Sequence, residues 1–167
     1  VLPSNIATID AIEVVDASNN NTITVLVSGE GDYEYALDDV DGPYQDSNIF
    51  EDVLPGLYTV FVRDKNDCGI ADELVSVIGF PKFFTPNGDG TNEFWQVKGI
   101  SNQFQPNTSI LIFDRYGKHL ATLRHDSPGW DGTLNGLNLP ASDYWFVANV
   151  ARGNQSFEVK GHFAIRR

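Results

Sequence analysis

The chain has 167 residues, 41% of them hydrophobic and 12% aromatic, so it can bury a substantial core and is not an intrinsically disordered segment. Its formal net charge is −12, and its acidic half, residues 1–80, would repel nucleic acid and anionic lipid surfaces. No apolar run approaches the ~20 residues that a membrane helix requires, and no signal peptide opens the sequence.

The charge is divided unevenly along the chain. Residues 1–80 hold 16 acidic and 2 basic side chains, a net charge of −14, whereas residues 81–167 hold 7 acidic and 9 basic side chains, a net charge of +2. Such a shift predicts two domains, 1–80 and 81–167, with a short linker over about Ile78–Pro81. Because the chain contains no methionine, we do not expect Val1 to be a translation start, and we expect a larger upstream protein to be covalently continuous with it.

The acidic half alternates hydrophobic and polar side chains over short stretches, as half-buried β-strands do. In the clearest case, Ile23, Val25 and Val27 share one face of an extended segment. The stretches recur at roughly 8–12-residue spacing, which is typical of a β-sandwich. The strands expected after a lead-in over Val1–Ile9 are Ala11–Val15, Thr22–Ser28, Tyr33–Leu37, Ile49–Leu54, Leu57–Arg63 and Asp72–Ile78.

Cys68 is the single cysteine of the chain, so it has no internal disulfide partner. The nearby Asp64, Asp67 and Asp72 would raise the pKa of its thiol, which argues against a reactive nucleophile. We therefore expect Cys68 to be a small buried hydrophobic residue.

The second half has the same alternation with different turns, and both halves together predict an all-β protein of two tandem immunoglobulin-like β-sandwich domains. In the last expected strand, Gly161 falls among the inward-facing residues and marks either a bulge or a tightly packed site. A long loop is expected over His125–Asn138 and a hairpin turn over Arg152-Gly153-Asn154. The strands expected are Lys82–Phe84, Glu93–Val97, Ser109–Tyr116, His119–Leu123, Tyr144–Ala151 and Phe157–Ile165.

The stretch Phe83–Trp95, FFTPNGDGTNEFW, places a tight polar loop between two aromatic pairs. Asn87, Asp89 and Thr91 alternate as oxygen ligands do in a Ca²⁺ loop. The stretch departs from the EF-hand pattern, with Asn92 where glycine and Lys98 where glutamate would stand. Two interpretations stay open: a ligand-free turn stabilised by its own side chains, which we favour, and a Ca²⁺ site of another type.

No catalytic motif is present, and we expect no enzymatic activity. His119, His125 and His162 lack the spacing of metal ligands. A glycosidase-like pair among Asp114, Asp131 and Asp143 is disfavoured because Asp131 and Asp143 lie in turn sequences, where aspartate bonds the local backbone.

Trp130-Asp131-Gly132 has two interpretations. An exposed Trp130 beside a carboxylate would stack on sugar rings, which would make the chain an extracellular carbohydrate- or ligand-binding module. We favour the alternative, in which Trp130 fills one end of the core while Asp131 and Gly132 form the turn.

Several motifs in register resemble a known family. The opening stretch resembles F-(T/S)-P-N-G-D-G-x-N-(D/E)-x-W of the gliding motility-associated C-terminal domain, the type B sorting domain of the Bacteroidota type IX secretion system. Glu93 and Asp143 are mild departures from the family pattern. The resemblance continues through Ile112–Gly117, Gly129–Gly132, Leu139–Phe146 and Lys160–Arg166.

This resemblance implies an immunoglobulin-like domain that acts as a folded C-terminal signal. Such a signal is recognised in the periplasm and carries its cargo, gliding adhesins among them, through the outer-membrane translocon to the cell surface or medium. The resemblance also implies a PorP/SprF-like outer-membrane protein as partner. Residues 1–80 more loosely resemble Ig-like or SprB-like repeats, through Leu54–Val60 and Asp64–Cys68, which implies a structural spacer of a surface adhesin.

A translocon reads a folded domain through exposed surface, and the loops and the ordered terminal strand of a rigid sandwich provide such surface. We expect the translocon to recognise the loop within Phe83–Trp95, here called the opening loop, and the last expected strand, Phe157–Ile165. Arg166 and Arg167 would add charge contacts. The candidate recognition residues are Pro86, Asn87, Gly88, Asp89, Gly90, Asn92, Arg115, Gly117, Lys160, Gly161, Arg166 and Arg167.

Overall fold

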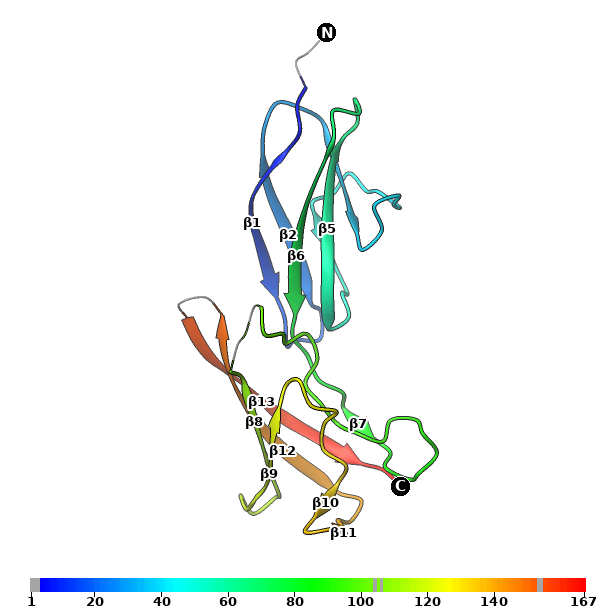
Figure 1. The fold of residues 1–167 in the computed structure, drawn as a ribbon, viewed down its shortest axis with the longest axis vertical. Coiled ribbons are helices and arrows are strands. Elements are labelled where there is room, and N and C mark those ends of the chain that lie inside the picture. The colour runs from blue at the N-terminus through cyan, green and yellow to red at the C-terminus, as the bar shows by residue number, and fades with distance from the viewer. Residues whose placement is uncertain (1–3, 104, 106, 153–154) are drawn as a thin grey trace. The chain divides into compact units, whose positions relative to one another are not determined.

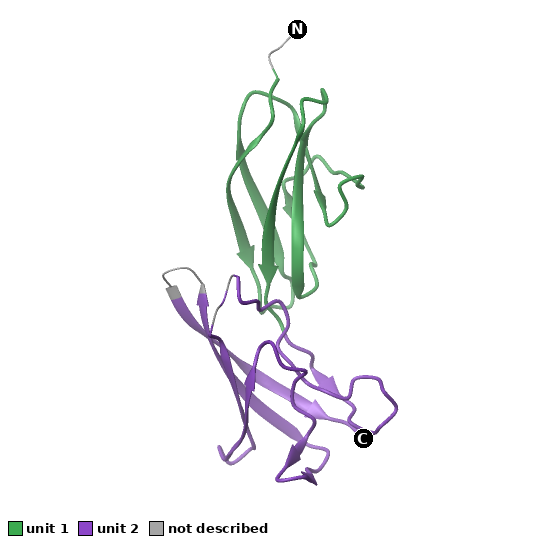
Figure 2. Ribbon diagram, viewed as in Figure 1, with its two compact units in different colours: residues 1–79 green, residues 80–167 purple. Residues whose placement is uncertain are grey.

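The computed structural model describes residues 4–103, 105, 107–152 and 155–167, and their regular structure consists of β-strands (Figure 1). The predicted all-β fold class is confirmed. Among the described residues there is no helix long and apolar enough to cross a membrane. The chain divides into two compact units, residues 1–79 (unit 1) and 80–167 (unit 2), with the division one residue from the predicted boundary (Figure 2).

Unit 1 contains two antiparallel sheets in its described residues, each with three strands. The first has the order β1-β2-β4 and the second the order β3-β5-β6. The strands are β1 (Thr8–Val15), β2 (Thr22–Ser28), β3 (Tyr33–Leu37), β4 (Ile49–Phe50), β5 (Gly56–Asp64) and β6 (Ile70–Val77).

The two sheets of unit 1 share one hydrophobic core. Ile23 and Val25 of β2 and Val60 and Val62 of β5 are fully buried. These residues alternate with more exposed ones along each strand, because successive side chains of a strand point to opposite faces. The alternation read from the sequence therefore identifies the inner faces of this sandwich correctly.

Unit 2 is built on a sheet whose described strands have the order β7-β13-β12-β8-β9 (Figure 1). The β7–β13 pair is parallel and the other pairs are antiparallel. A separate small hairpin joins β10 (Thr133–Leu134) to β11 (Leu137–Asn138). The strands of the sheet are β7 (Phe83–Phe84), β8 (Ser109–Phe113), β9 (His119–Arg124), β12 (Asp143–Arg152) and β13 (Gln155–Ile165).

The inner face of this sheet is aromatic and is covered by irregular chain. Trp95 is fully buried and stacks on Phe163 of β13, with ring centroids 4.1 Å apart and planes at 13°. Phe146 of β12 lies 4.8 Å from the Trp95 ring. Trp130, from the segment before β10, makes an edge-on contact with Tyr144 at 5.3 Å. Two loop tryptophans thus provide much of the layer that opposes the sheet.

The strand predicted over Glu93–Val97 is wrong. Trp95 and Val97 are buried and Phe94 is exposed, so the side chains do alternate. The backbone of this stretch, however, forms only an isolated bridge between Trp95 and Trp130, because among the residues that the structure describes no neighbouring strand continues the pairing. The predicted loop over His125–Asn138 is also wrong in part, since it contains the β10–β11 hairpin around Asn135-Gly136.

Gly161 is a tightly packed site and not a bulge. Its register with Phe146 continues without a shift along β12 and β13. A Cβ at Gly161 would lie 2.8 Å from Phe80 Cζ and 3.2 Å from Phe146 Cε1. Of the predicted Arg152-Gly153-Asn154 turn, Gly153 and Asn154 lie outside the described residues.

Candidate functional site

The opening loop, residues 85–94, bonds to itself through its own polar side chains. Asn87 Oδ1 accepts a hydrogen bond from the Asp89 backbone N–H at 3.1 Å, and Asp89 Oδ1 accepts one from Thr91 N–H at 2.8 Å. Glu93 Oε1 accepts from Gly90 N–H at 3.1 Å. The Asn87 and Asp89 bonds are Asx turns, in which a short side chain replaces a backbone acceptor. The loop therefore has a defined shape without a ligand.

Backbone conformation also explains the composition of the opening loop. Gly88 and Gly90 both have φ near +82°, where a Cβ is strained. Asn92 has φ +53°, a conformation that asparagine tolerates better than most residues. At the base of the loop, Thr85 N–H donates to Asn92 O at 2.8 Å and closes it.

Arg167 links the opening loop to the rest of its end of unit 2. Its guanidinium donates to Pro86 O at 2.8 Å, to Leu139 O at 2.9 Å and to Gly132 O at 3.4 Å. Charge-assisted hydrogen bonds of this kind are stronger than neutral ones. Arg167 thus holds three separate segments together. A partner that contacts Arg167 would have to do so while these hydrogen bonds are in place.

Arg115 and Gly117 lie in the turn between β8 and β9. Arg115 Nη2 donates to Ser142 Oγ at 2.9 Å, and Ser142 O accepts from Ile165 N–H of β13 at 2.9 Å. Gly117 has φ +81°, and no atom lies within 4 Å of the position that its Cβ would occupy. Beside this turn is a cleft of about 200 Å³, lined by Asp114, Arg115, Tyr116, Lys118, Leu120, Leu134, Leu139, Pro140, Ser142, Asp143 and Tyr144.

The predicted recognition residues therefore fall into two groups. The opening loop, Arg166 and Arg167 are brought together by the β7–β13 pairing and the Arg167 hydrogen bonds, and the turn with Arg115 and Gly117 joins them through Ser142. Lys160 and Gly161 lie farther back along β13, where Lys160 is exposed and Gly161 is packed against Phe80. The Leu139–Phe146 motif contains Leu139 and Ser142, but it did not indicate that they bond Arg167 and Arg115, because contacts between distant segments leave no mark on local sequence.

Ca²⁺ is expected to leave the melting temperature of unit 2 unchanged, because Asn87 and Asp89 already accept backbone hydrogen bonds. Among the described residues, no group of three or more His, Cys, Asp or Glu side chains is placed to hold a metal ion. Asp89→Ala should cost about 1 kcal/mol through the lost turn bond, with or without Ca²⁺. Thermal melting with added Ca²⁺ or with chelator checks this; a Ca²⁺-dependent rise that Asp89→Ala abolishes would contradict it.

The histidines and aspartates considered as ligands or catalysts have local roles. Asp114 Oδ1 accepts from the backbone N–H groups of Tyr116 and Lys118, and Asp131 Oδ1 accepts from Thr133 N–H at 3.0 Å. His119 contacts Thr122 Oγ1 at 2.9 Å. The carboxylates at Asp114 and Asp131 are therefore turn-forming groups, as sequence context indicated for Asp131.

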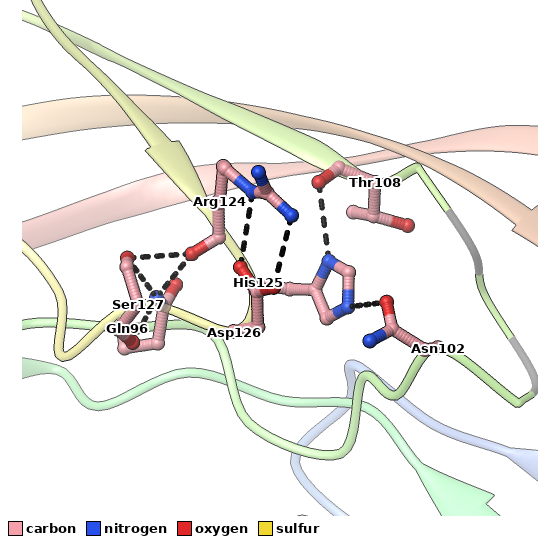
Figure 3. A network of polar contacts seen from close by, with 7 residues as sticks. All are labelled: Gln96, Asn102, Thr108, Arg124, His125, Asp126 and Ser127. Carbon is pink, nitrogen blue, oxygen red and sulfur yellow. Dashed lines mark hydrogen bonds and ion pairs between the residues drawn. The ribbon is translucent and has the colours of Figure 1, made fainter.

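His125 belongs to a polar network that the sequence did not predict (Figure 3). Its ring nitrogens contact Thr108 O at 3.3 Å and Asn102 Oδ1 at 2.8 Å. On the other side of the same turn, Gln96 Nε2 donates to Arg124 O at 2.9 Å and to Ser127 O at 3.1 Å. The network ties the turn after β9 to two segments of irregular chain.

Trp130 is buried, with 4% of its surface exposed, and its indole N–H donates to Thr133 O at 3.0 Å. It packs against Phe84, Tyr144 and Phe163. The favoured interpretation as a core residue holds. The carbohydrate-binding alternative required an exposed Trp130 ring. The buried indole has no free face on which a sugar could stack.

Cys68 is exposed, so its predicted burial is wrong. It follows the Lys65-Asn66 turn after β5, and its thiol donates to Ser4 O at 3.3 Å. Hydrogen bonding to the Asp64 carboxylate raises the pKa of the Cys68 thiol, and desolvation raises it further. The predicted rise in the pKa of the Cys68 thiol is therefore correct, and the buried Asp64 is its main cause. The pKa of Asp64 itself is lowered by a hydrogen bond from the hydroxyl of Ser4.

Alkylation of Cys68 by iodoacetamide at pH 8 should be slower in the folded chain than in the chain unfolded by urea, because a raised pKa leaves less thiolate. Asp64→Asn should accelerate the reaction of the folded chain several-fold, whereas Asp72→Asn should change it little. Mass spectrometry measures the rate, and circular dichroism confirms that the variants fold. An unchanged rate in Asp64→Asn would disprove this account of the thiol.

Comparison with known proteins gives one family. Residues 78–165, more than half of the chain, match the family model described as CHU_C Type IX secretion signal domain. No curated protein matches. Among solved structures, a chain titled "Biofilm associated protein - BSP domain" is similar at a TM-score of 0.32 and 11% identity. The match covers 92% of this chain and 29% of that one, so the chain spans less than a third of its length.

Proposed function

Because the chain belongs to the CHU_C family of type IX secretion signal domains, we propose that unit 2 is a folded C-terminal sorting signal for the protein attached upstream of it. The family match over residues 78–165 is the observation that carries this proposal. The cargo is exported through the outer membrane to the cell surface or the medium. The role is one of recognition, without catalysis and without a nucleic-acid partner.

The organisation of unit 2 supports a signal read in the folded state. A fixed arrangement of the contacted residues lowers the entropic cost that a receptor pays to recognise a folded domain. The opening loop is closed by its own hydrogen bonds, and Arg167 fixes the C-terminal end of β13 to that loop. The surface is therefore ordered before any partner binds.

The finer assignments extend the same proposal. The recognition partner would be the type IX translocon together with a PorP/SprF-like outer-membrane protein. Unit 1, a sandwich with a strongly acidic sequence, would be a structural spacer of a gliding adhesin or a related surface protein of Bacteroidota. An acidic surface keeps such a spacer soluble and disfavours self-association.

The proposal is tested by truncation. A reporter with its own signal peptide is fused to residues 1–167 and expressed in a bacterium with a working type IX system. We expect the reporter outside the outer membrane, and we expect removal of residues 80–167 to leave it in the periplasm while unit 1 remains attached. Export that persists without residues 80–167 would refute the assignment of the signal to unit 2.

A further inference from the structure

Among the residues that the structure describes, one edge of the unit 2 sheet is open along most of β13. On one side β13 pairs with β12 over its whole length, whereas on the other side β7 pairs with it only at Ala164 and Ile165. Ile165 N–H donates to Ser142 O on the β12 side. Ala164 N–H donates to Lys82 O on the β7 side. Because successive residues of a strand direct their backbone groups to opposite sides, these two bonds fix the direction of every other residue of β13.

Ser156, Glu158 and Lys160 therefore direct their backbone N–H and C=O groups away from β12. The register between β12 and β13 continues without a shift, so no bulge interrupts this alternation. Within the described part of the chain, these backbone groups have no hydrogen-bond partner. Unpaired groups in a row at a sheet edge are a template on which a further strand pairs. The chemistry of the edge thus calls for an extended backbone as its occupant.

The side chains along this edge carry one charge of each sign. Glu158 and Lys160 are exposed on the outer face of the sheet, and Val159 between them is buried. Neither Glu158 nor Lys160 forms an ion pair with another described residue. The residues opposite them on β12, Asn149 and Val147, are uncharged. An acidic and a basic side chain therefore lie two positions apart on the open edge, and both are available to a strand that pairs there.

We propose that a second copy of the chain pairs with this edge, β13 against β13, antiparallel and centred on Val159. In this register Glu158 lies opposite Lys160 of the second copy, and Lys160 lies opposite its Glu158. Each of these two pairs exchanges two backbone hydrogen bonds, because the groups of both residues point toward the partner strand. The two-fold axis repeats the contact between opposite charges.

The charge pattern selects this register over its neighbours. Moving the centre by one residue places Glu158 opposite Glu158 of the second copy, or Lys160 opposite its Lys160. A parallel pairing in register does both. Like charges directly opposite each other destabilise a sheet, whereas opposite charges stabilise it. The pairing would hold two copies of the upstream protein together, a property separate from the sorting function.

Sedimentation equilibrium of residues 1–167 tests the pairing, in about 150 mM salt to screen the repulsion between the acidic halves of two copies. We expect a dimer at chain concentrations up to about 100 μM, and Lys160→Glu or Glu158→Lys should each raise its Kd at least about tenfold. These two variants change the net charge in opposite directions, so an effect of net charge alone would not weaken the dimer in both. The double variant, Glu158→Lys with Lys160→Glu, restores the opposite pairs and should return Kd to within about threefold of the parent.

A parent chain that stays monomeric at about 100 μM would overturn the proposal and leave the edge to a strand of another protein. A double variant that dimerises no better than the single variants would overturn it as well, because Glu158 and Lys160 would then not face each other. Thermal melting is the control for folding. Both side chains are exposed, so the melting temperature should not change.

Disulfide formation tests the register, in a Cys68→Ser background that removes the exposed native thiol. Val159→Cys should link two copies, because its Cα would lie about 4.5 Å from its counterpart, within reach of a disulfide. Ser156→Cys, at an exposed position of the same strand, should not link them, because its counterpart would lie about 20 Å away along the strand. Linking by Ser156→Cys in preference to Val159→Cys would overturn the proposed register.

Discussion

Replacing Trp95 with alanine is expected to lower the free energy of unfolding of unit 2 by about 4 kcal/mol, within the range for deletion of a buried tryptophan side chain. Trp95 is fully buried against Phe163 and Phe146. Its indole N–H donates to Pro81 O at 2.9 Å, so the variant also leaves that carbonyl without its partner. The melting temperature should fall by roughly 15–30 °C, since each 1 kcal/mol is worth about 4–8 °C in a domain of this size.

Tryptophan fluorescence measures this loss in unit 2 alone, because the three tryptophans of the chain, Trp95, Trp130 and Trp145, all belong to that unit. Trp145→Ala is the matched control, because that ring is 40% exposed and its removal leaves no cavity. If Trp95→Ala and Trp145→Ala melt alike, Trp95 is not the centre of the core.

Gly129→Ala is expected to destabilise unit 2 by about 3 kcal/mol or more. Gly129 has φ +121°, a region that side chains rarely adopt, and its Cβ would lie 2.4 Å from the backbone oxygen of Trp95. That oxygen accepts the hydrogen bond from Trp130 N–H at 2.9 Å, and Trp95 N–H donates back to Trp130 O at 2.9 Å. Backbone cannot move aside as a flexible side chain can, so the bridge that holds both tryptophans would be displaced.

Gly136→Ala separates the cost of backbone strain at positive φ from the cost of the close contact with the Trp95 oxygen. Gly136 also has positive φ, +80°, but no atom lies within 4 Å of its Cβ position. Its cost should be about 1 kcal/mol, from backbone strain alone. Chemical denaturation of both variants, followed by tryptophan fluorescence, gives the difference. Equal losses would mean that the close approach at Gly129 contributes nothing.

The strands were predictable because a sheet with one buried face leaves a period of two in the sequence. Val60 and Val62 of β5 and Val159 and Phe163 of β13 follow that period and are buried. The same period wrongly predicted a strand around Trp95. Side chains there alternate between buried and exposed, but the backbone pairs only at Trp95 itself, with Trp130. Periodicity reports which way side chains point and contains no information on whether another strand is present to bond.

The candidate site was predictable only as a set of motifs. Asn87 and Asp89 were recognisable as turn residues from the glycines beside them, and the structure shows those turns. Arg167 was expected to be a surface charge, yet it donates to carbonyls of three segments distant in sequence. Long-range contacts to backbone oxygens depend on the tertiary fold, so local sequence could not indicate them. Cross-strand register likewise brings Phe113, Trp145 and His162 together, which local sequence could not indicate.

The most direct test of the sorting function is export of a periplasmic reporter that carries residues 1–167. The fusion is expressed side by side in a strain with a working type IX secretion system and in an otherwise identical strain that lacks its outer-membrane translocon. The family membership of the chain predicts reporter at the cell surface or in the medium of the first strain and only in the periplasm of the second. Reporter retained in the periplasm of both strains, or exported equally by both, would contradict it.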